Sequence, residues 1–120
     1  MSTPLTRWRA MRQQFHRHPE VGLELPRTKA KVAEYLRAMD IEVHEGTGVV
    51  GVLRSGKGNR AIGLRADMDA LPVSEASAHG YVSETEGKMH ACGHDGHMVM
   101  LLAAAERLAA DPEFDGTVVF

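Results

Sequence analysis

The stretch from Met98 to Ala110 constrains the fold of this chain most. It is almost wholly apolar, with Glu106 and Arg107 as its polar exceptions, and it contains neither glycine nor proline. Such a run is too short to span a bilayer but long enough for a helix of ordinary length. It predicts a helix that is buried around most of its circumference, over residues 98–108 at least, and packed against a sheet.

The nine residues Met89–His97 lead into this helix and hold three histidines, one aspartate and the only cysteine of the sequence. Imidazole and thiolate are good ligands for borderline metals such as zinc. Cys92 and His94 flank Gly93, which allows a sharp turn, so we expect their donor atoms to converge on one metal ion. The alternatives are a small buried thiol and solvated loop histidines, since no HExxH or CxxC pattern is present.

The remaining elements follow from periodicity and from breaking residues. Apolar spacing predicts helices over residues 5–17 and 26–39; the first ends before His18-Pro19 and the second begins at Pro26. Apolar runs predict strands over residues 41–44, 49–53, 61–64 and 116–120. The glycine-rich turn at residues 55–59 suggests that the second and third of these strands form a hairpin. This order predicts an α/β fold with a mixed sheet flanked by helices.

Two aspartates follow the third predicted strand. Asp67 and Asp69 are two residues apart, so their side chains share one face if the chain is extended there. Residues 74–88 are polar and irregular, which predicts a surface loop.

Composition excludes several classes of function. A net charge of −2 gives no reason to expect nucleic acid or an anionic membrane as a partner. A single cysteine cannot form an internal disulfide, and the N-terminus has no signal-like apolar core. We therefore expect a one-domain cytoplasmic chain.

Four segments, in this order, resemble segments of the metal-dependent amidohydrolases of the M20 peptidase family. The resemblance is to the branch of hippurate hydrolases, N-acyl-amino-acid amidohydrolases and auxin-conjugate hydrolases. The segments are His16-Arg17-His18-Pro19-Glu20-Val21-Gly22-Leu23-Glu24, Thr47-Gly48-Val49-Val50-Gly51, Leu64-Arg65-Ala66-Asp67-Met68-Asp69-Ala70-Leu71-Pro72 and Met89–His97.

The resemblance implies that residues 1–120 are the N-terminal part of a zinc-exopeptidase-like catalytic domain. It assigns metal ligation to Cys92 and His94 at a site for a divalent ion, zinc or manganese, and possibly for two ions. The other ligands, the catalytic glutamate base and a smaller dimerisation domain are expected beyond Phe120. No catalytic residue is therefore assigned within this chain, and the 120 residues alone are expected to be inactive.

Around these ligands the resemblance suggests supporting residues, each with a structural alternative. Asp67 and Asp69 either orient a ligand, Asp69 being the better choice, or cap a turn. Asp95 and His97 are expected to cap or pack at the start of the helix rather than to bind metal. His90 either forms part of the site wall or is solvated. His16 and His18 are expected to be turn-forming residues. Arg65 is expected to pair with Asp67 or Asp69, or else to clamp a substrate carboxylate.

The function implied is hydrolysis of the amide bond of N-acyl amino acids by metal-activated water, in a homo-oligomeric full-length enzyme. The alternative is a truncated, non-catalytic metal-binding or interaction domain. The sequence beyond Phe120 distinguishes the two.

Overall fold

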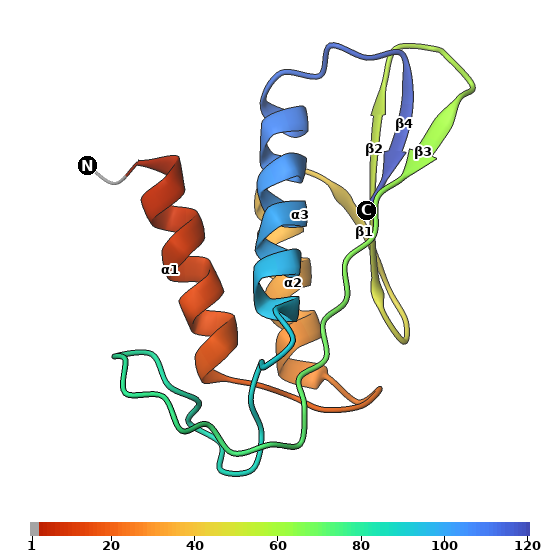
Figure 1. Ribbon diagram of the computed structural model, residues 1–120. Coiled ribbons are helices and arrows are strands. Elements are labelled where there is room, and N and C mark those ends of the chain that lie inside the picture. The colour runs from red at the N-terminus through yellow and green to blue at the C-terminus, as the bar shows by residue number, and fades with distance from the viewer. Residues whose placement is uncertain (1–2) are drawn as a thin grey trace.

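The computed structural model describes residues 3–120. Met1 and Ser2, the first residues of the N-terminus predicted to lack a signal-like core, lie outside the described residues. Three helices and four strands follow one another (Figure 1), in the order α1 (Pro4–Arg17), α2 (Pro26–Ala38), β1 (Glu42–Glu45), β2 (Val49–Ser55), β3 (Ala61–Gly63), α3 (His94–Ala110) and β4 (Gly116–Val119). Every predicted element is present. Among the described residues, no helix is both long and apolar enough to cross a membrane.

Helix α2 begins at Pro26, as predicted, and α1 begins at Pro4. The Thr3 hydroxyl caps α1 by accepting from the Thr6 N–H at 3.1 Å. At α2 the capping residue Leu25 has no polar side chain. The Glu20 carboxylate accepts instead from the N–H of Thr28, at 2.6 Å, and of Arg27, at 3.2 Å. Helix α2 is therefore tied at its N-terminus to the turn that follows α1.

The sheet has the strand order β1-β2-β4-β3 and is mixed. Strands β1 and β2 pair antiparallel, as do β2 and β4, whereas β3 and β4 run parallel. The predicted hairpin of residues 49–53 with 61–64 is therefore wrong, because β4 lies between those strands. The glycine-rich turn at residues 55–59 instead binds the residue that precedes β4. The Asp115 carboxylate accepts from the N–H of Lys57 and of Gly58, both at 2.7 Å, and Gly58 lies too close to Asp115 for a Cβ.

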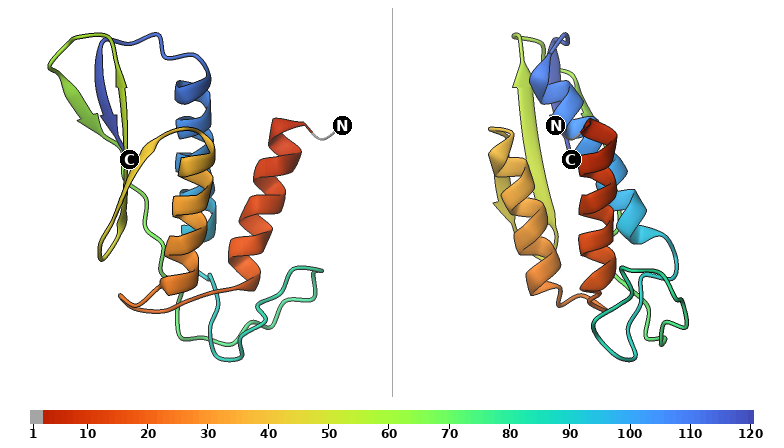
Figure 2. Two further views of the ribbon diagram at one scale, coloured as in Figure 1. Left: turned by 180° about the vertical axis from the view of Figure 1, so that it is seen from behind. Right: turned by 90° about the vertical axis from the view of Figure 1, so that its left-hand side faces the viewer.

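The three helices lie on the same side of the sheet, as both figures show (Figures 1 and 2). Helix α2 packs on β1 and β2, and α3 packs against α1 and α2. The apolar core forms where these layers meet; its buried members are Phe15, Val32, Leu36, Ile41, Met98, Val99, Leu102, Ala105, Val118 and Phe120. The mixed sheet is confirmed, and its helices cover a single face.

Helix α3 begins at His94. Met98, Val99, Leu102 and Ala105 are buried, and most other residues up to Leu108 are partly buried. Met100, which is 64% exposed, and Arg107 lie on an exposed flank. The predicted burial around most of the helix is therefore confirmed only in part, because no element of residues 3–120 covers this flank.

Candidate functional site

The segment that leaves β3 runs beside two other parts of the chain. Ala70 forms a bridge with Val21, and Leu71 forms one with Met89. The N–H of Ala70 donates to the carbonyl of Glu20 at 2.8 Å, and Leu71 and Met89 exchange backbone hydrogen bonds. These contacts hold the extended aspartate segment directly in front of the start of α3.

His94 is the point where this segment and α3 meet. Its Nδ1 donates to the carbonyl oxygen of Asp69 at 2.8 Å and lies 3.0 Å from the Asp69 Oδ1. Its Nε2 lies 3.3 Å from the Asp67 Oδ2. Asp67 and Asp69 thus share one face, as their spacing predicts, and they contact opposite nitrogens of the same ring.

The tautomer of His94 follows from these partners. A carbonyl oxygen can only accept, so the hydrogen of the neutral imidazole lies on Nδ1 and the lone pair on Nε2. A carboxylate or carbonyl on the far nitrogen is the usual way in which proteins orient a metal-binding histidine. The contacts of Asp69 fix the orientation of the His94 ring, and its role toward a metal ligand stays a prediction.

Cys92 is a free, exposed thiol on the loop before α3, two residues ahead of His94. Gly93 between them has φ +86°, in the left-handed region that favours glycine. Gly93 also occupies the cap position of α3, without a side chain to accept from the helix. Binding of one metal ion by Cys92 and His94 stays a prediction.

His97 lies nearer to this site than predicted. Its Nδ1 is 2.8 Å from the Asp67 Oδ1, and its ring stacks on that of His94 with centroids 5.5 Å apart. The hydrogen bond from His97, opposed by burial, is the main cause that lowers the pKa of Asp67. Donor atoms of Asp67, His94 and His97 all lie within 4.8 Å of one another, so these three side chains form a group that could hold a metal ion.

Asp95 points away from this group and toward α1. Its side chain is 2% exposed; Oδ1 accepts from the Gly96 N–H at 2.9 Å, and Oδ2 accepts from His16 and Arg12. The predicted contact with the N-terminal turn of α3 is therefore present. The contact with α1 was not predicted.

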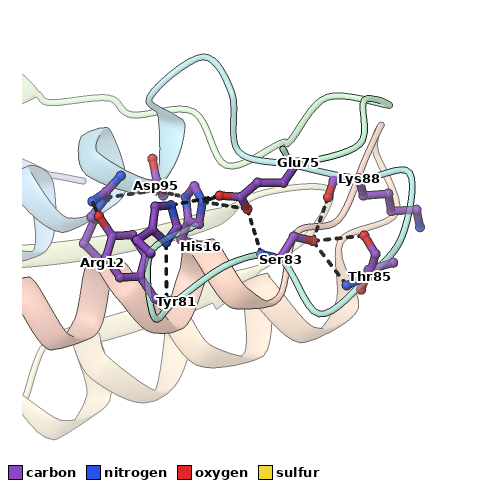
Figure 3. Close-up of polar contacts among 9 residues, drawn as sticks. Arg12, His16, Glu75, Tyr81, Ser83, Thr85, Lys88 and Asp95 are labelled. Carbon is purple, nitrogen blue, oxygen red and sulfur yellow. Dashed lines mark hydrogen bonds and ion pairs between the residues drawn. The ribbon is translucent and has the colours of Figure 1, made fainter. Parts of the chain in front are cut away.

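A second polar cluster surrounds His16 (Figure 3). His16 lies within α1 and is 2% exposed, so its predicted role as a turn-forming residue is wrong. Its Nδ1 lies 2.8 Å from Asp95, and its Nε2 lies 3.1 Å from both oxygens of Glu75. His79 Nε2 is 2.9 Å from Glu75. Donor atoms of His16, Glu75 and His79 also lie within 4.8 Å of one another.

Sequence reasoning missed Glu75, because residues 74–88 read as a polar surface loop. The loop is irregular, but the Glu75 side chain is only 3% exposed. Burial raises its pKa, yet hydrogen bonds from the Ser83 N–H and from His16 outweigh burial and lower the pKa of Glu75 to about 2. The weak signal available was a carboxylate four residues before a histidine, a pair that is common on solvated loops.

The remaining polar residues resolve the open assignments. His90 is 4% exposed, and neither of its ring nitrogens has a hydrogen-bond partner in the described part of the chain. Burial is the main cause that lowers the pKa of His90.

His18 lies 3.4 Å from Glu84. The predicted ion pair of Arg65 with Asp67 or Asp69 is absent within residues 3–120, where Arg65 is exposed.

A hollow of about 760 Å³ opens beside the aspartate segment. Asp67 and Asp69 lie on its wall, and apolar side chains line the rest, among them Met68, Leu101 and Phe120. The site thus combines orientable metal donors with an adjoining apolar recess, which is the usual composition of a small-molecule site.

Comparison with known proteins places these features in a family context. Residues 63–120 match the model of peptidase family M20/M25/M40. Hippurate hydrolase of Campylobacter jejuni is 48% identical over 111 residues, which are 90% of this chain and 29% of that protein. Thermostable carboxypeptidase 2 of Saccharolobus solfataricus is 45% identical over 107 residues, or 86% of this chain and 27% of that protein.

A solved structure is also similar. It is that of the Bacillus subtilis YXEP protein, described as a dinuclear metal binding peptidase from the M20 family. It superposes with a TM-score of 0.93 at 34% identity and covers 98% of this chain and 34% of that one. The present chain therefore spans about a third or less of the length of the proteins that it matches.

Proposed function

Because this chain belongs to peptidase family M20/M25/M40, we propose that it is the N-terminal part of the catalytic domain of a metal-dependent amidohydrolase. The proposed reaction is hydrolysis of the amide bond of N-acyl amino acids of the hippurate type. The relative named hippurate hydrolase supports this choice of substrate class. The remaining ligands, the base and a dimerisation domain belong, on this proposal, to sequence beyond Phe120.

One observation carries the proposal. The Nδ1 of His94 donates to the carbonyl of Asp69, and its Nε2 lies 3.3 Å from the Asp67 Oδ2. With the hydrogen on Nδ1, the Nε2 lone pair lies on the side of the Asp67 carboxylate. A cation bound there would be ligated by both Nε2 and the carboxylate, so the residues present fit a metal ion.

We assign Cys92 and His94 as the ligands that this chain supplies. The exposed thiol of Cys92 lies on the loop directly before α3, two residues ahead of His94. An alternative set of ligands is Asp67 with His94 and His97, whose donor atoms lie close together. Thiolate and imidazole suit zinc, and a carboxylate-rich set suits manganese. The dinuclear relative supports a site for two ions.

The divalent ion, when bound, supplies an activated water and polarises the amide carbonyl. The residues of this chain have separate tasks. Cys92 and His94 would hold the ion at the N-terminal end of α3, Asp69 would fix the ring of His94, and the adjoining apolar hollow would take the acyl group. Transfer of the proton to the leaving nitrogen requires a base, and we place that base beyond Phe120.

The second candidate function is a non-catalytic metal-binding or interaction domain. The test compares the 120-residue chain with the full-length protein by release of free amino acid from an N-acyl substrate. The isolated chain should be inactive, and the full-length protein should lose activity with a chelator and regain it with zinc or manganese. Cys92→Ser and His94→Ala should each lower metal affinity and activity together. Full activity of the chelated full-length protein would remove the metal mechanism. A homo-oligomeric state and a cytoplasmic location stay predictions.

A further inference from the structure

Three segments that are distant in the sequence meet in one buried polar chain beside the proposed metal site. Helix α1 contributes Arg12 and His16, the loop of residues 74–88 contributes Glu75, and α3 contributes Asp95 (Figure 3). We call these four residues the anchor network. The side chains of His16, Glu75 and Asp95 are each 3% exposed or less, so water does not screen their charges.

The contacts of the anchor network form one continuous series. The Asp95 Oδ2 accepts from the Arg12 Nε at 3.0 Å and lies 2.8 Å from the His16 Nδ1, while Glu75 contacts the other nitrogen of His16. Glu75 also accepts from the Ser83 N–H at 2.7 Å. Each of these buried polar side chains therefore has its partner within the series, and loss of one would leave another buried polar group unsatisfied.

The anchor network ends one residue from the proposed ligand. His94 turns toward Asp67 and Asp69, whereas Asp95 turns toward α1. The start of α3 has no side-chain cap, because Gly93 stands at the cap position. Asp95 replaces that cap: its Oδ1 accepts from the Gly96 N–H, and its Oδ2 is fixed by α1. The direction of the first turn of α3, and so the place of the His94 ring, depends on this contact.

A metal ion within the second cluster is the competing explanation. The Nδ1 of His79 accepts from the Tyr81 N–H at 3.3 Å, which places the ring hydrogen on Nε2, 2.9 Å from Glu75. His79 therefore donates a hydrogen bond to Glu75 and offers no lone pair to a cation at this position.

We propose that Arg12, His16, Glu75 and Asp95 are positioning residues that hold the first turn of α3, and with it His94, in the geometry needed for metal binding. This inference rests on the proposed function for the metal, but its test separates the two. The network also makes the loop of residues 74–88 a structural support of the site, through Glu75.

The test uses the full-length protein loaded with cobalt(II) alone, whose visible bands and thiolate charge-transfer band report ligand geometry. In Glu75→Gln we expect shifted cobalt bands and a kcat reduced about tenfold or more, with KM changed less than about threefold. Glu84→Gln is the matched control. It makes the same chemical change in the same loop, at a side chain that is 61% exposed and pairs with His18 at the surface. Its spectrum and kcat should equal those of the unmodified protein.

Arg12→Gln is a second variant, needed if Glu75→Gln does not fold. Arg12 is 38% exposed and lies at the solvent-exposed end of the anchor network, so its substitution disturbs the fold less. It should shift the cobalt bands in the same direction by a smaller amount. A folded variant of either kind with an unchanged spectrum and an unchanged kcat would overturn the inference. Loss of one bound metal equivalent in His79→Ala would overturn it in favour of a second metal site. An unmodified protein without any thiolate–cobalt band would instead count against the proposed function.

Discussion

The contact between Asp69 and His94 allows the metal proposal to be tested quantitatively. The His94 Nδ1 has two acceptors on Asp69, the backbone carbonyl at 2.8 Å and the carboxylate Oδ1 at 3.0 Å. The substitution Asp69→Asn removes the negative charge and keeps both the carbonyl and a side-chain oxygen. It therefore changes the electrostatics around the ring while leaving its orientation largely intact.

The expected loss of metal affinity in Asp69→Asn follows from the contacts with His94 that this variant keeps. Loss of a partner that orients a metal ligand costs about 10–100-fold in metal affinity. Because the carbonyl of Asp69 still fixes the tautomer of His94, we expect the low end of this range, about tenfold, or about 1.4 kcal/mol. Removal of the same charge from a residue far from the site should leave the affinity unchanged.

Competition titration with a chromophoric zinc chelator measures this affinity in the full-length protein. Asp111→Asn is the matched control, since Asp111 is exposed at the opposite end of α3 from His94. An affinity equal to that of the unmodified protein would show that Asp69 does not act on a metal ligand. A loss far above 100-fold would show that Asp69 itself binds the ion.

Three further predictions follow from burial and charge. Leu102→Ala should lower the free energy of unfolding, measured by urea denaturation of this chain, by about 2–3 kcal/mol; this is the lower part of the usual range, because Leu102 lines an open hollow into which neighbours can relax. Met100→Ala, at a 64% exposed position of the same helix, should cost less than about 0.5 kcal/mol. The pKa of Glu75 is lowered from 4.5 to about 2, so its contribution to stability is complete above about pH 4.5 and is lost as the pH falls toward 2. Urea titrations between pH 5 and pH 3 should therefore show a smaller loss of stability in Glu75→Gln than in the unmodified chain. His97→Ala should leave zinc affinity nearly unchanged if Cys92 and His94 hold the ion, and should lower it at least tenfold if Asp67, His94 and His97 do.

Local elements of this fold could be predicted from the sequence, but their pairing could not. Helices α1 and α2 appear at the predicted positions because proline and apolar spacing act within a few residues. The partner of β2 depends instead on β4, which lies more than fifty residues further along the chain. The glycine-rich turn at residues 55–59 has the residue types of a hairpin loop. Its sequence does not reveal that the distant Asp115 accepts hydrogen bonds from its backbone.

The same limit applies to the burial of α3. Residues 98–110 are apolar apart from Glu106 and Arg107, so the sequence predicts burial around most of the helix. Burial requires an element to cover each side, and residues 3–120 provide none for the flank that carries Met100. Apolar character therefore predicts which surface can be buried, while the arrangement of the other elements decides which surface is buried.

The two neighbouring residues His94 and Asp95 show where prediction of a site from sequence ends. The contacts of His94 could be expected from the sequence, because Asp67 and Asp69 have the spacing of one face of an extended segment and His94 begins the adjacent helix. The contacts of Asp95 could not be expected, because His16 and Glu75 belong to segments with no shared periodicity. A metal ligand is recognised by its residue type and spacing, whereas the residues that support it need only reach it through space. Supporting residues of this kind become visible once burial and charge are known together. The feature that reveals them here is a set of three nearly unexposed ionisable side chains next to the proposed ligand His94, in which Glu75 and Asp95 both contact His16.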